Sequence, residues 1–199
     1  MKLLIISGTP KKDGLCFSLA EAAFAAAETA GADAELVKLG EYKLAPCAMC
    51  GEGWGTCSGK HRCEFGKEDG FDELQSKCAE ADAFVYVTPV YWSEVSETLK
   101  LFFDKLRRCE ATKQWGGDKT EVSILSGKPS ILVVSAGGGG GGIVTALAQM
   151  ERAVGHMGGD AMPRERKGIF DYVAVNRWNQ DFKREALKAS VTLLVKTLI

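Results

Sequence analysis

Four cysteines in one short stretch are the residues of this chain best suited to chemistry. Cys47, Cys50, Cys57 and Cys63 form the pattern C-x2-C-x6-C-x5-C in a segment rich in glycine. Four thiolates in one irregular loop suit a tetrahedral zinc ion or an iron–sulfur cluster. The cysteines therefore predict one shared metal site, and their spacing leaves zinc and iron both open.

Other cysteine chemistries fit this pattern less well. Gly51, rather than histidine, follows Cys50, which excludes attachment of a c-type haem. A zinc deaminase needs an H-x-E half before its P-C-x-x-C half, but both histidines of the chain, His61 and His156, come later. Cys47 and Cys50 open no obvious helix, which disfavours a disulfide oxidoreductase. His61 is expected to be solvated rather than a ligand.

A second candidate site is the segment Ser7–Gly14, which joins a buried strand to a helix. A helix N-terminus exposes unpaired N–H groups and the positive end of the helix dipole, so it favours a phosphate. Thr9 can donate a hydroxyl hydrogen and Lys11 adds positive charge. The segment matches no P-loop pattern. The alternative is an ordinary turn with solvated lysines.

Two further loops follow strands and complete a candidate cofactor site. Thr88–Ser96 carries the aromatic pair Tyr91-Trp92, which could flank a planar ring or fold back over a helix. The six glycines Gly137–Gly142 allow a ligand to approach backbone N–H groups closely. A phosphate together with a flat, partly apolar ring describes flavin mononucleotide (FMN).

These loops must be positioned by the surrounding elements, which the hydrophobic pattern predicts. Expected strands cover 2–6, 34–39, 83–87, 131–135 and, near an irregular segment, 160–163; expected helices cover 15–30, 71–81, 95–108, 143–157 and 182–198. Alternating strands and helices predict an α/β fold with a parallel sheet and helices on both faces. Ligands bind outside the carboxyl ends of such strands, where the three loops lie. We expect a single domain over 1–199 with a Cys-rich loop at about 44–66.

Composition excludes several classes of protein. The 199 residues include 25 Lys and Arg against 26 Asp and Glu, which argues against nucleic acid as a partner. No apolar run approaches the length of a membrane span, so no membrane partner is expected. The N-terminus lacks a signal-peptide cleavage pattern, which predicts a cytoplasmic location. With two histidines, the chain offers few candidates for the acid–base residues of a hydrolase, and no catalytic side chain is assigned.

At this point the motifs resemble a known family. Ser7–Gly14, Thr88-Pro89-Val90-Tyr91-Trp92 and Leu99–Leu106 are similar to the flavodoxin-like NAD(P)H-dependent FMN reductases, and the four cysteines resemble those of its iron–sulfur flavoprotein branch. The glycine run and Arg177-Trp178-Asn179 also fit that branch. The resemblance implies a flavodoxin-like five-stranded parallel sheet of order 2-1-3-4-5, bound FMN, and a homodimer or homotetramer.

The resemblance also assigns site residues. The phosphate would be held by Ser7, Thr9, Lys11, Gly14, Leu15 and Cys16. The ring would be flanked by Pro89, Val90, Tyr91 and Trp92, with Ser93 and Ser96 nearby, and its polar edge would meet Ser135, Ala136, Gly137 and Gly138.

The chain departs from the family pattern in three places. Leu15-Cys16 replaces two polar phosphate ligands, and Lys11 replaces an arginine, which removes a bidentate donor. Gly53 stands where the branch has its third cysteine, and Cys57 follows four residues later.

The leading functional prediction is therefore an oxidoreductase in which electrons pass between FMN and a [4Fe–4S] cluster or a small acceptor. The redox donor would be a compound or protein such as NAD(P)H or ferredoxin. One alternative is an FMN or quinone reductase whose cysteine loop holds structural zinc. Another is a non-enzymatic zinc-loop binding module on a flavodoxin-like scaffold.

Overall fold

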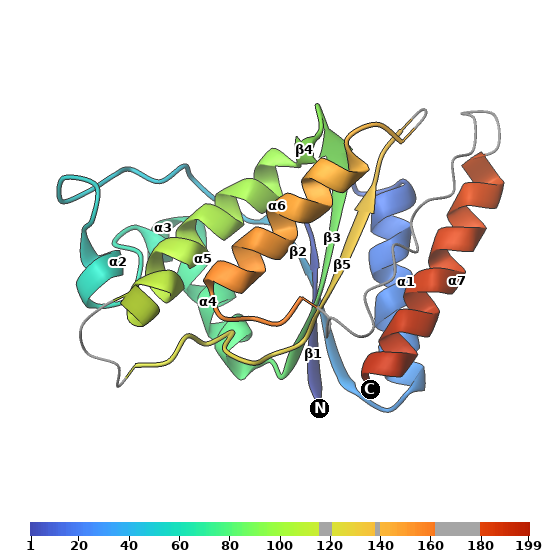
Figure 1. The fold of residues 1–199 in the computed structure, drawn as a ribbon, viewed down its shortest axis with the longest axis horizontal. Coiled ribbons are helices and arrows are strands. Elements are labelled where there is room, and N and C mark those ends of the chain that lie inside the picture. Colours follow the sequence, from blue (N-terminus) through green and yellow to red (C-terminus); the bar gives the residue numbers. More distant parts are fainter. Residues whose placement is uncertain (116–120, 138–139, 162–179) are drawn as a thin grey trace.

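Four parallel strands form the middle layer of the protein (Figure 1). They are β1 (Lys2–Ser7), β2 (Asp33–Lys38), β3 (Ala83–Tyr91) and β5 (Ser130–Ser135), in the order β2-β1-β3-β5. The computed structural model describes residues 1–115, 121–137, 140–161 and 180–199. Within that part, the order agrees with the first four positions of the flavodoxin-like order expected from the sequence.

Helices cover both faces of the sheet. α1 (Leu15–Thr29) and α7 (Gln180–Leu198) lie on one face, whereas α4 (Phe71–Glu80), α5 (Glu97–Trp115) and α6 (Ile143–His156) lie on the other (Figure 1). None of the helices in these described stretches combines the length and the apolar character needed to cross a membrane.

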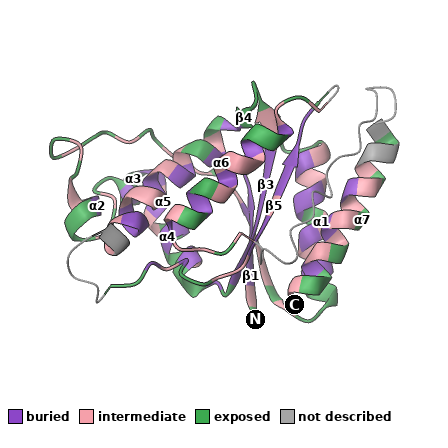
Figure 2. Ribbon diagram, viewed as in Figure 1, coloured by how far each residue is buried: buried purple, intermediate pink, exposed green. Residues whose placement is uncertain are grey.

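The strands are buried from both sides because successive side chains alternate between two cores. On β1, Leu3 and Ile5 pack into the cluster beneath α1 and α7, while Leu4 and Ile6 pack into the cluster beneath α4, α5 and α6. Burial on both faces explains why this strand reads as a continuous apolar run rather than an alternating one. Figure 2 shows the buried residues on the strands and on the inward sides of the helices.

Three expectations about the elements require correction. β3 continues to Tyr91 instead of ending at residue 87, because it pairs with the short antiparallel strand β4 (Glu94–Val95) as a hairpin. α5 extends to Trp115, beyond the expected end at residue 108. Of the expected fifth parallel strand, Asp160 forms a single parallel bridge with Pro129, and residues 162–163 lie outside the described residues.

The Cys-rich segment is an insert between β2 and α4, with little regular structure. It contains a 3-10 turn η1 (Leu39–Glu41) and the short helices α2 (Thr56–Gly59) and α3 (Gly66–Asp69). It projects beyond α5 on the side of the sheet away from α1 and α7 (Figure 1). The assignment of 1–199 to one domain stays a prediction.

Candidate functional site

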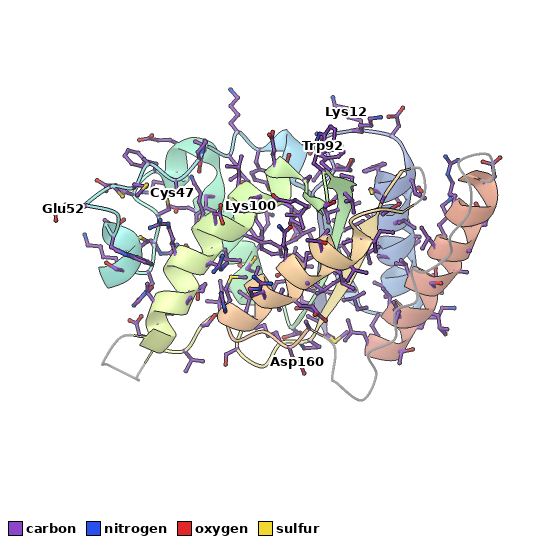
Figure 3. The ribbon with its side chains drawn as sticks, turned by 45° about the horizontal axis from the view of Figure 1, so that its top comes forward. Lys12, Cys47, Glu52, Trp92, Lys100 and Asp160 are labelled. Atoms are coloured by element: carbon purple, nitrogen blue, oxygen red, sulfur yellow. The ribbon has the colours of Figure 1, made fainter. Side chains whose placement is uncertain are left out.

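The carboxyl ends of three adjacent strands meet at one edge of the sheet. Ser7 lies in register with Val87, and Pro89 lies in register with Ser135. The backbone N–H of Gly8 donates to the carbonyl oxygen of Val87 at 2.8 Å, so the first loop is tied to β3 where it leaves the sheet. Lys12 and Trp92 both lie toward this end, and Asp160 lies at the opposite end (Figure 3).

A pocket of about 120 Å³ opens beside the first loop. Its lining includes the hydroxyl residues Ser7 and Thr9 and the three lysines Lys11, Lys12 and Lys38. Ser7 is 1% exposed, and its Oγ atom has no hydrogen-bond partner in the described part of the chain. A buried hydroxyl without a partner is costly, and a bound anion would supply the missing acceptor.

The start of α1 is open to backbone binding. Gly14 is the N-cap residue, with φ +107°. Because glycine has no side chain, the first turn of α1 has no side-chain cap. Its carbonyl oxygen accepts from the N–H of Ser18 at 3.0 Å. Leu15 is half-buried, and Cys16 packs into the core beneath α1. The backbone N–H groups of this first turn are therefore suited to binding an anion, and the roles of Leu15 and Cys16 stay predictions.

The β3–β4 hairpin carries the aromatic pair at its tip. Tyr91 pairs with Glu94, so Trp92 and Ser93 are the two turn residues, with φ +51° and +68°. Two positive φ angles define a tight primed turn, a conformation that costs energy for residues other than glycine. Trp92 is 99% exposed and Tyr91 is also exposed, whereas Pro89 and Val90 are half-buried.

Ser96 has a structural role that the sequence did not indicate. It precedes α5, where its Oγ accepts from the N–H of Leu99 and donates to the carbonyl oxygen of Gly8. Its own N–H donates to Thr88 Oγ1 at 3.1 Å. Its hydroxyl is thus engaged within the protein, and it fixes the first loop against the start of α5.

The third loop is described in part. Ser135 and Ala136 are buried at the end of β5, and Gly137 is exposed. Gly138 lies outside the described residues. The three loops converge on one edge as expected, while the roles assigned to their residues stay predictions.

The insert and α5 enclose a second cavity, of about 350 Å³. All four cysteines of the motif, Cys47, Cys50, Cys57 and Cys63, line it. Cys109 of α5, which is fully buried, lines it as a fifth thiol. In the described stretches, no three His, Cys, Asp or Glu side chains are arranged to hold a metal ion, so the thiols surround the cavity without forming a ready coordination shell.

A buried ion pair forms part of the wall of this cysteine cavity. Lys105 Nζ contacts Asp69 Oδ2, and the two residues are 3% and 6% exposed. Asp69 also accepts from the N–H groups of Ala45 at 3.0 Å and Phe71 at 3.1 Å. The pair therefore joins the two ends of the insert to α5. Burial raises the pKa of the Cys63 thiol in the same cavity.

The far side of the insert is fastened by a polar network. His61 Nδ1 lies 3.1 Å from both the carbonyl oxygen of Cys109 and Thr112 Oγ1, and Thr112 Oγ1 donates to the carbonyl oxygen of Cys57 at 3.2 Å. Gln75 Nε2 donates to the His61 carbonyl oxygen at 2.9 Å. The expectation that His61 is solvated is wrong, because α5 supplies partners that lie far away in sequence.

Sequence reasoning missed the cavity residues supplied by α5. They are Lys105, Arg108 and Cys109. Together with Thr112, which donates to the insert at Cys57, they have the spacing i, i+3, i+4, i+7 and therefore share one helix face. That spacing was a usable signal for a common face. Nothing in the local sequence indicates that the face meets the insert.

The fold and its loops at the strand ends define a flavodoxin-like α/β protein. An NAD(P)H:quinone oxidoreductase from Methanothermobacter marburgensis has a similar fold, with a TM-score of 0.67, 18% sequence identity, and coverage of 100% of this chain and 96% of that chain. The flavodoxin-like prediction is confirmed, apart from the strand details corrected above.

The chain belongs to the NADPH-dependent FMN reductase family, whose model matches residues 1–166. It is 33% identical over 106 residues to an iron–sulfur flavoprotein of Archaeoglobus fulgidus, a match that covers 53% of this chain and 46% of that protein. An iron–sulfur flavoprotein of Methanosarcina thermophila is 31% identical over 105 residues, covering 53% and 52%. The chain thus matches about half the length of these curated relatives. The resemblance found in the sequence is confirmed, and so is membership of an oxidoreductase family.

Proposed function

We propose that this chain is an FMN-binding redox flavoprotein that passes electrons between FMN and either a [4Fe–4S] cluster or a small acceptor. Membership of the FMN reductase family supports the flavin. The observation that carries the proposal is the buried Ser7 hydroxyl, which lacks a partner in the described residues and lines a pocket with three lysines. When bound, FMN supplies hydride and single-electron chemistry, and the protein supplies binding and orientation.

Different groups of residues would bind different parts of FMN. Ser7, Thr9 and Lys11, joined by Lys12 and Lys38, would bind the phosphate together with the backbone N–H groups that follow Gly14. Tyr91 and Trp92 would flank the ring from the hairpin, and the backbone of 135–138 would meet its polar edge. Ser96 acts indirectly, since it holds Gly8 against α5.

The phosphate assignment is tested by comparing two flavins. Titration of flavin-free protein with FMN and with riboflavin, followed by flavin fluorescence, should show clearly tighter binding of FMN. Riboflavin lacks the phosphate and is otherwise the same ligand. Equal affinity for both would contradict phosphate binding by Ser7–Gly14.

For the second centre, we propose that Cys47, Cys50, Cys57 and Cys63 hold a [4Fe–4S] cluster. All four line one cavity, and their thiolates are a complete donor set for a cluster. Iron suits a protein that moves electrons, because zinc does not change valence. A structural zinc ion, in a reductase or in a non-enzymatic binding module, is the alternative that the same donor set permits.

Metal analysis after anaerobic reconstitution separates these possibilities. The cluster requires about four irons per chain, whereas one zinc and no iron would overturn it. Cys57→Ala should abolish iron loading, and Cys109→Ala should preserve it, with FMN bound in both variants. The reverse result would show that Cys109, not Cys57, supplies the ligand missing at Gly53.

The remaining assignments are part of the same proposal. We take NAD(P)H or a ferredoxin as the electron donor, a homodimer or homotetramer as the assembly, and the cytoplasm as the location. Stopped-flow mixing of the FMN-loaded protein with NADH, NADPH or reduced ferredoxin identifies the donor by the rate at which flavin absorbance is lost.

A further inference from the structure

A groove on the outer side of α5 lies next to the cysteine cavity and is distinct from the edge of the sheet that carries the three loops. Its volume is about 520 Å³, which is within the range of small-molecule sites. Residues from the insert and from α5 line it, among them Cys47, Met49, Trp54, Asp104, Arg107 and Arg108. Cys47 and Arg108 line both this groove and the cysteine cavity, so the two spaces share a wall.

The insert supplies an apolar, aromatic side of the groove. Trp54 is 49% exposed and Met49 is 64% exposed, although both are large hydrophobic side chains. The Arg108 guanidinium carbon lies 4.9 Å from the centroid of the Trp54 ring, a cation–π contact that fixes the ring. Arg108 also donates from Nη1 to the carbonyl oxygen of Gly53. The aromatic surface is therefore held in place and remains half open to solvent.

α5 supplies a positive side of the groove. Neither Arg107 nor Arg108 forms an ion pair with a carboxylate in the part of the chain that is described. Arg107 Nη2 lies 2.8 Å from His156 Nδ1, and its buried Nε has no acceptor among those residues. The carboxylate of Asp104 is engaged by Lys100 at 2.5 Å. Two guanidinium groups thus line the groove without an ion-pair partner in the described residues, and the charge of Asp104 in the same lining is offset by Lys100.

We infer that this groove binds a planar aromatic compound that carries an anionic group, such as a quinone sulfonate or carboxylate. The ring would lie on Trp54 and Met49, and the anion would be held by Arg107 and Arg108, whose planar forks suit such oxygens. That this aromatic compound serves as the small electron acceptor rests on the proposed function. In that role a quinone takes two electrons from the reduced flavin and two protons from solvent, and leaves as the hydroquinone.

Calorimetric titration of the FMN-loaded protein with anthraquinone-2-sulfonate tests the inference. Its neutral analogue 2-(hydroxymethyl)anthraquinone has the same rings and should bind about tenfold more weakly, because the charge-assisted contacts are lost. Arg108→Gln and Trp54→Leu should each weaken binding of the sulfonate by about tenfold. Arg152→Gln is the matched control, since it removes the same charge from α6 outside the groove and should change nothing.

Several results would overturn the inference. Equal binding of the two anthraquinones, or equal losses in Arg108→Gln and Arg152→Gln, would show that no specific anion site exists. Sensitivity to Trp92→Leu without sensitivity to Arg108→Gln would place the ring at the flavin site. A change of oligomeric mass in Trp54→Leu and Arg108→Gln, seen by sedimentation with sulfonate binding unchanged, would assign the groove to contact between copies of the chain.

The failure of the inference can be told apart from failure of the proposed function. The FMN titration does not involve the groove. If the protein fails to bind FMN yet binds the sulfonate through Arg108, the proposed function is refuted and the groove is still a binding site. If the protein binds FMN tightly but does not bind the sulfonate, only the inference about the groove is refuted.

Discussion

Ser93, at the tip of the β3–β4 hairpin, rests directly on the backbone of Gly142, the N-cap residue of α6. A Cβ atom at position 142 would lie 2.4 Å from Ser93 Cα and 2.9 Å from its Oγ. Gly142 also has φ +85°, in the region that favours glycine. One glycine of the run therefore has a defined purpose, which is to let the hairpin sit against the start of α6.

Gly142→Ala is expected to displace the hairpin tip. The added methyl group overlaps backbone atoms, and alanine is strained at this φ, so the free energy of unfolding should fall by about 1–3 kcal/mol. Urea denaturation measures this loss, and the FMN titration should show weaker binding because Tyr91 and Trp92 move. Gly141→Ala is the control, because its Cβ would meet nothing within 4 Å. Equal effects of the two variants would contradict the packing role of Gly142.

Ser7→Ala should weaken FMN binding without destabilising the flavin-free protein. Ser7 Oγ is buried and lacks a partner in the described residues, so its removal costs the flavin-free fold no hydrogen bond. With FMN bound, loss of a charge-assisted hydrogen bond should cost about 1.5–3 kcal/mol of binding free energy.

Ser130→Ala provides a matched comparison for Ser7→Ala. Ser130 Oγ is also buried without a partner in those residues, but it lies at the opposite end of β5 from Ser135. Its removal should leave FMN affinity unchanged. If both variants bind FMN as the wild type does, Ser7 does not contact the phosphate.

Lys105→Met should destabilise the protein strongly. It leaves the carboxylate of Asp69 buried without its cation, and breaking a buried pair in this way typically costs about 3–5 kcal/mol. Adding Asp69→Asn should restore part of the loss, since the amide oxygen carries no charge and can still accept a backbone N–H. Urea denaturation of the single and double variants measures the difference. A double variant less stable than Lys105→Met would refute this account.

Tyr42 makes a contribution to the stability of the protein that is lost at alkaline pH. Burial, and the hydrogen bond that its hydroxyl donates to Glu73 at 2.9 Å, raise the pKa of Tyr42 to about 12 from its ordinary value of 10.0. Folding thus favours the protonated phenol. That contribution is complete below pH 10 and is lost as the pH rises toward 12.

Comparison with Tyr42→Phe checks this pH dependence. The difference in unfolding free energy between wild type and variant should be constant between pH 7 and about 9, since the unfolded phenol is still protonated there. It should then decrease from pH 10 to 12, because the variant has no phenol to ionise. A difference that stays constant up to pH 12 would contradict the coupling.

The sequence by itself determined the alternation of strands and helices and the cysteine motif. These features are local: an apolar run such as Leu3–Ile6 predicts a buried strand, and the spacing of Phe71, Leu74 and Cys78 predicts one helix face. Because the carboxyl ends of parallel strands share an edge, the same pattern predicted that Ser7, Thr88 and Ser135 end strands at one side.

The tertiary structure alone decided which distant groups complete each site. Lys105 and Cys109 reach the cysteine cavity, Lys38 reaches the pocket beside Ser7, and Gly142 meets Ser93, although each pair of partners is far apart in the chain. Such contacts depend on how strands, helices and the insert are arranged in space, and no local propensity encodes that arrangement. The same reason explains the wrong expectation for His61, whose ring lies against partners on α5. It also explains why the hydrogen bonds of Ser96 to Gly8 and Thr88 could not be predicted from the sequence.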